Sequence, residues 1–558
     1  MTTSDRPIRF GIMCNGPVLS AWMAKCVEEL LRLPDVAPAV LIVPEDQTAG
    51  VQRLRKLRRD RFLFQVYQEL LPPGAMRPVD MTTQLGKVPT LRCRVKTKGK
   101  FSEYFEDSDI RRIRENDLDF ILRFAFGIVR GEILRAARYG LWSFHHDDEM
   151  KYRGMPPGFW EIYLGDRVNG AILQRLTDRL DGGIVLRKGY FPTILQSWRR
   201  NLDQLHFGSA GWPASVCKDI GEGHAGYIDQ PPTKSTAPVF TAPTNLQMIR
   251  FWGKESRHAI RRGSRALLRH EEWCIGVVDR PIASFLQPQP HLPVRWLQTP
   301  GDGRFIADPF GAEVDGTAHI VYEDFLYRTT KGVIATVEAS AAGPPAKPKV
   351  ALDLPVHASY PYLFANNGDI LCVPETHHAR EVNLYRAVEF PTEWDKIATI
   401  LNGPAALDNT IFRHEGRWWL MNTDLDAGQY VNLYVYHARD LEGPWQPHAL
   451  NPVKSDVRSS RPGGTPFVHD GALYRPAQDC TRTYGGGITV NRILRLTPTE
   501  FAEEPAAVIQ PLADSPFPDG IHTISAVGDM TLIDAKRHRF IPSAIPYNLG
   551  YDRSGGGS

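Results

Sequence analysis

The 558-residue chain carries 66 Lys and Arg against 63 Asp and Glu, a formal net charge of +3. This balance argues against a protein that binds nucleic acid over its whole surface, because such proteins carry a clearly basic domain or stripe. Hydrophobic residues make up 42% of the chain and charged residues 23%, close to the globular average, which excludes bulk disorder. The length favours several domains, each with its own core.

The seven cysteines are widely scattered and contain no Cys-x-x-Cys pair, which predicts reduced thiols rather than a disulfide framework or a zinc site. The first residues run directly into an apolar strand without a secretion signal, and no window approaches the roughly 18 apolar residues of a membrane span. We therefore expect a cytoplasmic protein. The last five residues, 554–558, have the composition of a flexible artificial linker.

Up to about residue 220, short apolar runs alternate with segments of helical period. Strands alternating with helices predict an α/β fold with a doubly wound parallel sheet. Ligands of such sheets bind beyond the carboxyl ends of the strands, so residues just after each run are candidates for a site. The expected strands are 8–16, 39–45, 117–127 and 141–146, and the expected helices are 20–33 and 131–140.

A Pro- and Thr-rich stretch within 229–273 predicts an inter-domain linker between a first domain, 1–228, and a second, 274–553. Its second part, 247–273, is Arg-rich and helical in period. A basic amphipathic helix can rest on an anionic membrane or bind nucleic acid. We favour a solvated helix that packs its apolar face between the domains, because the segment is short and the rest of the chain is charge-balanced. That face consists of Ile249, Phe251, Ile260, Leu267 and Leu268.

From residue 274 the periodicity changes to two, and one pattern recurs. Each copy has an aromatic residue, a polar turn with a glycine, and an apolar strand. The turn glycines are Gly316, Gly368, Gly416 and Gly471, at steps of 52, 48 and 55 residues. Hairpin repeats near this length predict an all-β propeller with one four-stranded blade per repeat. Residues 527–543 can supply a fifth blade.

The segment 143–183 carries the candidate site of the first half. His145 follows the fourth expected strand, and the runs Lys151-Tyr152-Arg153-Gly154 and Leu180-Asp181-Gly182-Gly183 come after it. With the loop in 123–134, these ordered motifs resemble the folate-dependent formyltransferases over residues 8–215. The resemblance implies transfer of a formyl group from 10-formyltetrahydrofolate to the amine of a small acceptor, such as an aminosugar or a natural-product intermediate.

The resemblance also implies roles for single residues. His145 would be the general acid/base and oxyanion donor, and Asp181 its orienter and proton acceptor. Ser143 stands where the family has Asn, and its hydroxyl is shorter and donates one hydrogen bond. The oxyanion hole is then weaker or the backbone closer, and formyl hydrolysis or related one-carbon chemistry stays open. The implied folate contacts are Phe126, Gly127, Ile128 and Asp178.

The run His145 to Glu149 contains five potential metal ligands. Adjacent residues on an extended segment point to opposite sides, so they do not converge on one ion, and we expect no metal site. We interpret the acids Asp147, Asp148 and Glu149 as solvated or as recognising a cationic acceptor.

The repeats of the second half resemble the five-bladed propellers of arabinanase- and xylosidase-type glycosidases. In that resemblance Asp308 occupies the position of the base, Asp408 that of the pKa-tuning Asp, and Glu375 ends a strand of the second repeat. Arg461 and Asp479 belong to the fourth repeat. An Arg among carboxylates favours recognition of an anion or a carbohydrate over activation of water. Similar propellers are also fused to some glycosyltransferases, which indicates a sugar-containing ligand by analogy.

The leading hypothesis is therefore a formyltransferase whose propeller recognises the acceptor or its carrier. Its partner would be a small-molecule amine, possibly sugar-linked, with no nucleic acid and no membrane span. One alternative places glycosidase or glycosyl-transfer chemistry around Asp308, Glu375 and Asp408, beside a degenerate formyltransferase domain. Another makes both halves binding modules.

Overall fold

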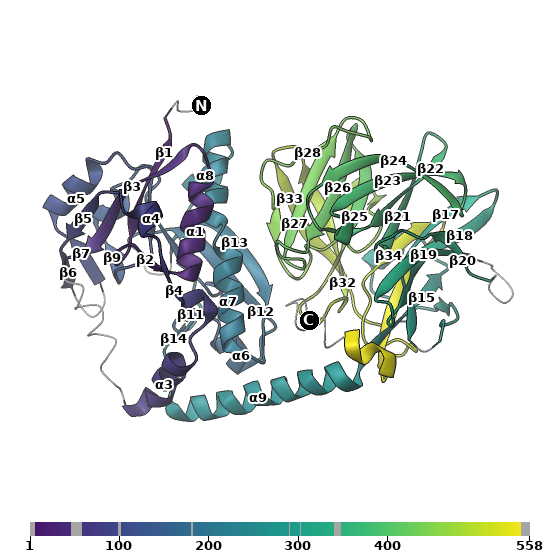
Figure 1. Cartoon of the computed structure of the whole chain (residues 1–558), viewed down its shortest axis with the longest axis horizontal. Helices are drawn as coiled ribbons and strands as arrows, with labels where there is room; N and C mark the ends of the chain where they lie inside the picture. Colours follow the sequence, from purple (N-terminus) through teal and green to yellow (C-terminus); the bar gives the residue numbers. More distant parts are fainter. Residues whose placement is uncertain are drawn as a thin grey trace. The chain divides into compact units, whose positions relative to one another are not determined.

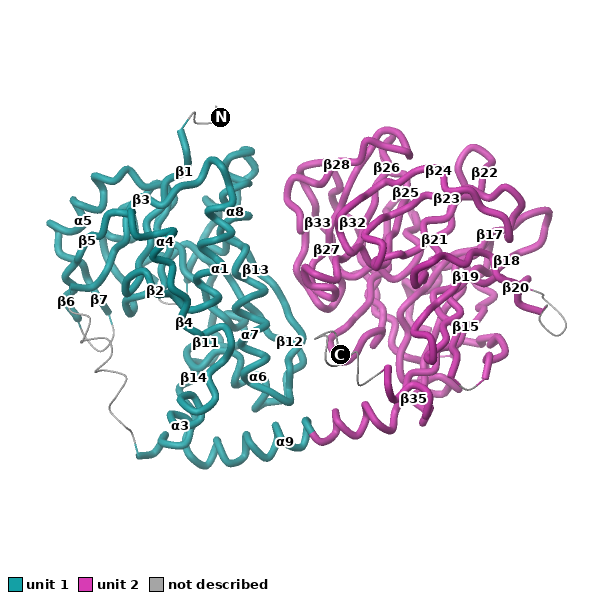
Figure 2. Tube along the Cα trace, in the orientation of Figure 1, with its two compact units in different colours: residues 1–259 teal, residues 260–558 magenta. Residues whose placement is uncertain are grey.

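The computed structural model describes residues 6–45, 59–98, 102–179, 182–289, 291–301, 303–339 and 347–547. The chain divides into two compact units, residues 1–259 and 260–558 (Figure 2). The division falls within one helix, α9 (Asn245–Leu268). The predicted linker, 229–273, lies among the described residues. The predicted artificial linker, 554–558, lies outside them.

A seven-stranded mixed sheet forms the centre of the first unit (Figure 1). Four of its parallel strands are the apolar runs of the sequence; the parallel strand at one edge and the two antiparallel strands at the other were not revealed by those runs. Inner strands of a parallel sheet are covered on both faces, which explains their continuous apolar sequence. In spatial order the strands are β13 (Ile184–Pro192), β12 (Val168–Arg175), β10 (Leu141–His145), β8 (Phe120–Arg123), β1 (Ile8–Met13), β3 (Val36–Pro44) and β5 (Thr90–Cys93).

Helices α1 (Ala21–Leu31), α7 (Trp198–Ser209) and α8 (Trp212–Glu222) pack against one another in this unit. Helix α5 (Asp107–Arg114) buries Ile110 and Ile113 against the sheet. The helix expected over 131–140 is only a 3-10 turn, Glu132–Arg135. Smaller elements are α3 (Phe62–Leu70), α4 (Thr82–Leu85), α6 (Trp160–Leu164) and the pairs β2 (Val18–Ser20) with β4 (Pro78–Asp80), β6 (Val95–Lys98) with β7 (Ser102–Phe105), and β7 with β9 (Ile128–Arg130).

The stretch expected to be a linker packs onto the first unit. Its strand β14 (Val239–Phe240) pairs with β11 (Arg153–Gly154), and Arg153 Nε donates to the Ala237 carbonyl at 2.7 Å. Helix α9 ends at Leu268, not at 273, because the chain enters strand β15 (His270–Val278). The prediction that the apolar face of this helix is packed is also wrong for most of its residues. Phe251 is buried, but four others are exposed: Ile249, Ile260, Leu267 and Leu268.

The second unit consists of five antiparallel sheets, the number and strand order expected of a five-bladed propeller. Four sheets follow in chain order. They are β17 (Arg304–Val314), β18 (Thr317–Leu326), β19 (Lys331–Glu338), β20 (Lys349–Leu352); β21 (Ser359–Asn366), β22 (Asp369–Glu375), β23 (Glu381–Glu389), β24 (Glu393–Asn402); β25 (Ala406–His414), β26 (Arg417–Asp424), β27 (Asn432–Ala438), β28 (Gln446–Pro447), with β29 (Lys454–Ser455) also on β27; and β30 (Phe467–His469), β31 (Ala472–Gln478), β32 (Ile488–Leu496), β33 (Phe501–Ile509).

The fifth sheet joins the two ends of the unit. Strand β15 pairs with β35 (Met530–Arg539), and β16 (Arg295–Trp296) and β34 (Ile524–Val527) flank this pair. The glycines that the repeats singled out all lie in the first hairpin of a sheet. Gly316, Gly368, Gly416 and Gly471 have φ of 74°, 91°, 76° and 73°, and a non-glycine residue at positive φ precedes each. Two consecutive positive φ values define the type I′ turns that suit twisted hairpins.

All seven cysteines are buried free thiols. Among the helices of the described residues, none combines the length and the apolar character needed to cross a bilayer.

Candidate active site

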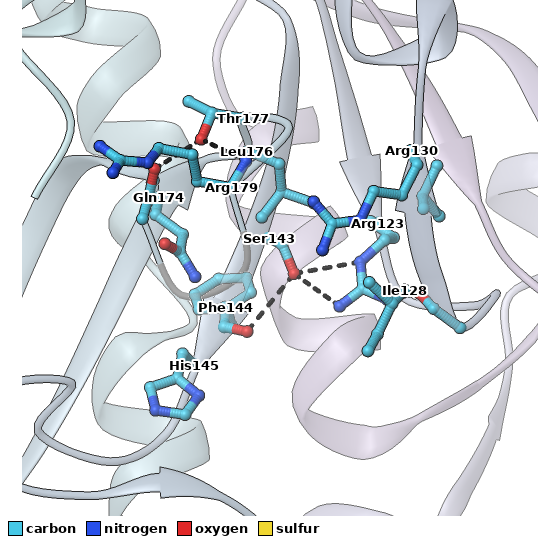
Figure 3. Close-up of a pocket in the computed structure, with 14 residues that line it drawn as sticks. Arg123, Ile128, Arg130, Ser143, Phe144, His145, Gln174, Leu176, Thr177 and Arg179 are labelled. Carbon is cyan, nitrogen blue, oxygen red and sulfur yellow. Dashed lines mark hydrogen bonds between the residues drawn. The ribbon is translucent and has the colours of Figure 1, made fainter. Parts of the chain in front are cut away.

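A pocket of about 140 Å³ opens at the carboxyl ends of β8 and β10 in the first unit (Figure 3). Arg123 ends β8, and Ser143 lies opposite it in the parallel register, so both side chains project to the same face of the sheet. His145 ends β10 and lines the same pocket. The structure therefore brings the predicted His145 and Ser143 together.

The hydroxyl of Ser143 is held by a half-buried cation that sequence reasoning missed. Arg123 donates from Nε and from Nη2 to Ser143 Oγ, at 3.2 and 2.9 Å (Figure 3). Two donated hydrogen bonds use the lone pairs of the hydroxyl oxygen, and its own proton is donated to the Phe144 carbonyl at 3.4 Å, a long hydrogen bond that a ligand oxygen can replace (Figure 3). Burial lowers the pKa of Arg123, and the nearby Glu103 carboxylate counters this shift. An Arg at the end of the apolar run Phe120–Arg123 is the signal that could have revealed it, because buried charges need partners.

The His145 ring is half-buried, and its Nε2 lies 3.4 Å from the carbonyl of Tyr152. A carbonyl only accepts, so this contact favours the tautomer with the proton on Nε2 and a lone pair on Nδ1. Asp181, the predicted orienter of His145, lies outside the described residues. Its role therefore stays a prediction.

The implied folate contacts divide into two groups. Gly127 and Ile128 line the pocket, whereas Phe126 and Asp178 do not. The carbonyls of Phe126 and Gly127 accept from Arg123 Nη1 at 3.1 and 2.7 Å, and the Gly127 N–H donates to Glu103 at 2.6 Å. Asp178 instead accepts from the Gly131 N–H at 3.2 Å on the surface. Much of the backbone expected to hold the pterin is therefore already bonded within the protein.

The acids after His145 are neither solvated nor turned toward an acceptor. Asp148 and Glu149 are buried, and both bind the ammonium of Lys188, at 2.9 and 3.0 Å. Asp147 accepts from the Gly158 N–H at 2.7 Å. Their cation is thus internal, which corrects the expectation that they recognise an external amine.

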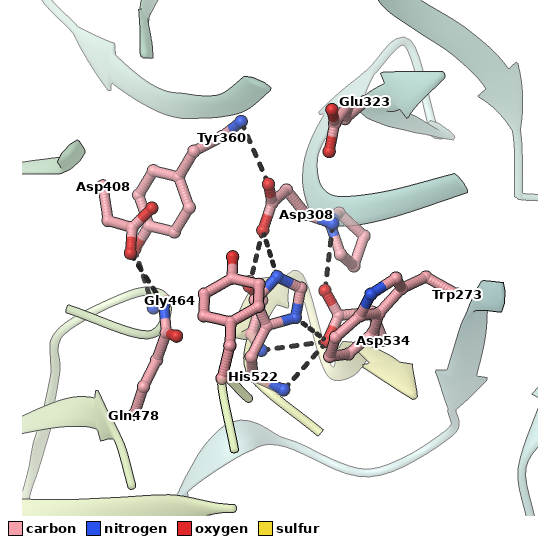
Figure 4. Close-up of polar contacts among 12 residues, drawn as sticks. Trp273, Asp308, Glu323, Tyr360, Asp408, Gly464, Gln478, His522 and Asp534 are labelled. Atoms are coloured by element: carbon pink, nitrogen blue, oxygen red, sulfur yellow. Dashed lines mark hydrogen bonds and ion pairs between the residues drawn. The ribbon is translucent and has the colours of Figure 1, made fainter. Parts of the chain in front are cut away.

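In the second unit, three consecutive sheets begin with the same backbone irregularity. The register of the first strand skips around Asp308, Tyr360 and Asp408, and these residues have φ of 52°, 41° and 51°. Positive φ is strained for residues other than glycine and persists only where the surroundings enforce it. Here the strain brings polar side chains of different sheets into one buried cluster (Figure 4).

One end of this cluster is a protonated histidine between two carboxylates. His522 Nε2 lies 3.1 Å from Asp308, and its Nδ1 lies 2.7 Å from Asp534. Burial lowers the pKa of His522, but the two carboxylates raise it to about 10. The three groups are close enough to hold a cation.

The other end is an ion pair between Arg461 and Asp408, with one contact at 3.2 Å. Burial lowers the pKa of Arg461, but Asp408, Tyr484 and Glu375 together outweigh burial and raise it. Gln478 Nε2 also donates to Asp408 at 2.7 Å, and Glu375 accepts from the Asp408 N–H at 2.8 Å. Each carboxylate predicted for this site is thus bonded to protein groups.

The predicted propeller residues therefore meet, with one exception. Asp308, Glu375, Asp408 and Arg461 are 1–6% exposed and belong to the cluster. The Asp479 carboxylate instead accepts from the Thr481 N–H at 2.9 Å and caps its own turn. Its neighbour Gln478 takes the central place. Sequence reasoning also missed His522 and Asp534; Asp534, an acid inside the apolar strand β35, is the one that could have been noticed.

Three comparisons with known proteins bear on these sites. Residues 296–512 match the family described as glucosamine inositolphosphorylceramide transferase 1, N-terminal. The chain is 37% identical to the protein of that name from Arabidopsis thaliana over 205 residues, which cover 36% of this chain and 27% of the plant protein. The chain thus spans little more than a quarter of that relative. This likeness of the second unit was not predicted.

A separate match is methionyl-tRNA formyltransferase from Agathobacter rectalis, 29% identical over 133 residues, 24% of this chain and 43% of that protein. This match supports the predicted formyltransferase likeness. Among solved structures, xylan beta-1,4-xylosidase from Bacillus halodurans C-125 overlaps with 37% of this chain and 47% of its own, at a TM-score of 0.30 and 14% identity.

Proposed function

We propose that the first unit transfers a formyl group from 10-formyltetrahydrofolate to the amine of an aminosugar, and that the second unit recognises the acceptor or its carrier. The observation that carries the proposal is the pocket that His145 and Ser143 share, with the Arg123 guanidinium behind the hydroxyl. The formyltransferase relative supports the donor. The plant relative, whose name includes glucosamine, supports an aminosugar as acceptor.

The pocket residues fit a donor of this kind. A dry cavity of ~150 Å³ holds a benzene ring, so a pocket of about 140 Å³ admits one ring of a bicyclic group. Gln174 and Thr177 would offer polar partners, and Arg130 and Arg179 would attract the carboxylates of a folate tail. When bound, the donor supplies an electrophilic formyl carbon on a nitrogen that can leave.

The chain's own groups then have separate tasks. The Ser143 hydroxyl donates to the oxygen on which negative charge develops, and the charge of Arg123 strengthens that donation. Arg123 thus compensates for the missing amide of the family. His145, with a lone pair on Nδ1, would remove a proton from the acceptor amine and return it to the donor nitrogen as the bond from that nitrogen to the formyl carbon breaks.

We place acceptor recognition near Arg461. Its guanidinium lies over the rings of Tyr430 and Tyr484, 5.6 and 4.9 Å from their centroids, and both rings are partly exposed. Aromatic faces beside a few oriented polar groups are typical of small-molecule sites. We do not extend the proposal to glycoside hydrolysis, because Asp308, Glu375 and Asp408 are buried and engaged by protein partners.

The proposal is tested by following the loss of 10-formyltetrahydrofolate with the full chain and a panel of amines. We expect turnover that depends on an aminosugar and falls at least about 100-fold in His145→Ala, as for a lost general base. His469→Ala, on an exposed hairpin of the second unit, is the matched control and should keep full activity. Formate release that does not depend on any amine would contradict transfer and favour hydrolysis.

A further inference from the structure

Helix α9 exposes a row of aliphatic side chains. Leu246, Ile249, Ile260 and Leu267 are 57%, 57%, 72% and 46% exposed. With about 100° of rotation per residue, positions 249, 260 and 267 fall within roughly 20° of one another, and 246 lies beside them. The row therefore runs along one side of the whole helix. A helix that only needs to be solvated gains nothing from such a row.

A basic row runs directly beside it. Its members follow one another at intervals of three or four residues, which places them on one helix face. All are exposed. They are Arg250, Lys254, Arg257, Arg261 and Arg265.

The single acid of the helix points away from both rows. Glu255 accepts from the Trp198 N–H at 2.8 Å and lies 3.3 Å from the Tyr67 hydroxyl. Met248 and Phe251 are fully buried in the same part of the first unit. These contacts fix the rotation of the helix against the first unit, so the aliphatic row and the four arginines face away from that unit, whereas Lys254 donates to the Tyr163 carbonyl at 2.5 Å.

We propose that α9 lies flat on an anionic lipid surface. The aliphatic row would enter the acyl boundary, while the long basic side chains reach phosphate groups beside it. A nucleic acid would pair with the basic row but leave the aliphatic row in water, so the two rows together favour lipid. This inference goes beyond the proposed function and does not depend on it.

The test is co-flotation of the full chain with phosphatidylcholine vesicles that contain about 30 mol% phosphatidylglycerol. We expect binding that weakens with added salt and is absent with phosphatidylcholine alone. Each basic residue near such a surface contributes roughly fivefold, so Arg257→Glu with Arg261→Glu should lower partitioning at least about 25-fold. Ile249→Ser with Ile260→Ser should lower it about tenfold, because the apolar insertion is lost.

The matched control reverses two exposed charges away from the helix, Lys218→Glu with Arg439→Glu, and should bind as the wild type does. Circular dichroism checks that every variant stays folded. Equal binding to both vesicle types, wild-type binding by either α9 variant, or no binding at low salt would overturn the proposal. Retention of an RNA duplex in place of vesicles would also overturn it and assign the basic row to nucleic acid.

Discussion

At the scale of single residues, the unusual feature of the first site is a hydroxyl oriented by a half-buried guanidinium. Because Arg123 and Ser143 act as one unit, their losses should not add. We predict that Ser143→Ala and Arg123→Met each lower kcat about 100-fold, and that the double variant is little worse than either. Steady-state rates of the three proteins decide this. Losses that multiply would show that the two side chains act separately.

In the second unit, the Arg461–Asp408 pair is buried, at 6% and 1% exposure. Removing one partner leaves an uncompensated charge, which typically costs 3–5 kcal/mol, about the amount we predict for Arg461→Met. Replacing both, as Arg461→Met with Asp408→Asn, should restore most of the stability, because Asn tolerates the positive φ of this position and can still accept from Gln478. Urea unfolding of both variants measures the effect. An unchanged midpoint in Arg461→Met would contradict a structural role for the pair.

Some site residues were accessible from sequence and others were not. His145 and Ser143 stand at the end of an apolar run, where a parallel sheet gathers its ligands, and the pocket includes both. Phe126 and Asp178 lie outside the pocket: the Phe126 carbonyl accepts from Arg123, and Asp178 accepts from the Gly131 N–H, contacts that no pattern in the sequence reveals. The prediction of Asp479 missed the central position by one residue. Strand alternation decides which of two neighbouring residues faces inward, and here it is Gln478.

At the scale of elements, glycines at positive φ serve different purposes. Gly416, at φ 76°, has open space where a Cβ would lie, whereas a Cβ on Gly464, at φ 129°, would overlap the carbonyl of Ile524. We predict that Gly416→Ala costs about 1 kcal/mol, from backbone strain alone. Gly464→Ala should cost more than ~3 kcal/mol, because the bridge from the fourth to the fifth sheet must move. Thermal unfolding of the pair tests the difference, and equal costs would contradict it.

Helix α6 contains a buried carboxyl group, Glu161, and a second buried carboxyl group, Asp147, interacts with it. Burial raises the pKa of Glu161 to about 7, and burial also raises that of Asp147. A carboxyl group whose pKa is higher in the folded state contributes its full stabilisation below its unfolded pKa, here 4.5. That stabilisation is lost as the pH rises through the folded-state value of about 7. The excess stability of wild type over Glu161→Gln should therefore decline from about pH 5 to about pH 8 in urea unfolding. A pH-independent difference would contradict the assignment.

Strongly periodic strands and helices could be predicted from the sequence, but short elements and the direction in which a helix packs could not. The four apolar runs became the parallel strands β1, β3, β8 and β10. The segment 131–140 has helical spacing but forms one 3-10 turn, Glu132–Arg135. Helix α9 was predicted in place, yet its packing was inverted, because periodicity alone does not say which side of an amphipathic helix meets the protein.

At the scale of the whole molecule, the change of period near residue 274 marks a real change of architecture. Repeats of about 50 residues predicted five four-stranded sheets; among the described residues of the second unit there are five sheets, four with four strands and one with five. The closure of the fifth sheet by β15 could not be read from the repeats, because β15 precedes the first of them. The ligand of this unit remains a proposal, since its polar cluster bonds chiefly to itself.

The most direct test of the central claim follows a labelled formyl group. The full chain is incubated with 10-formyltetrahydrofolate carrying ¹³C in the formyl group, and with glucosamine, while ¹³C NMR identifies the labelled product. The account predicts an N-formyl amide signal that grows with wild type and is absent with His145→Ala. Label found only as free formate, or equal amide formation by His145→Ala, would contradict it.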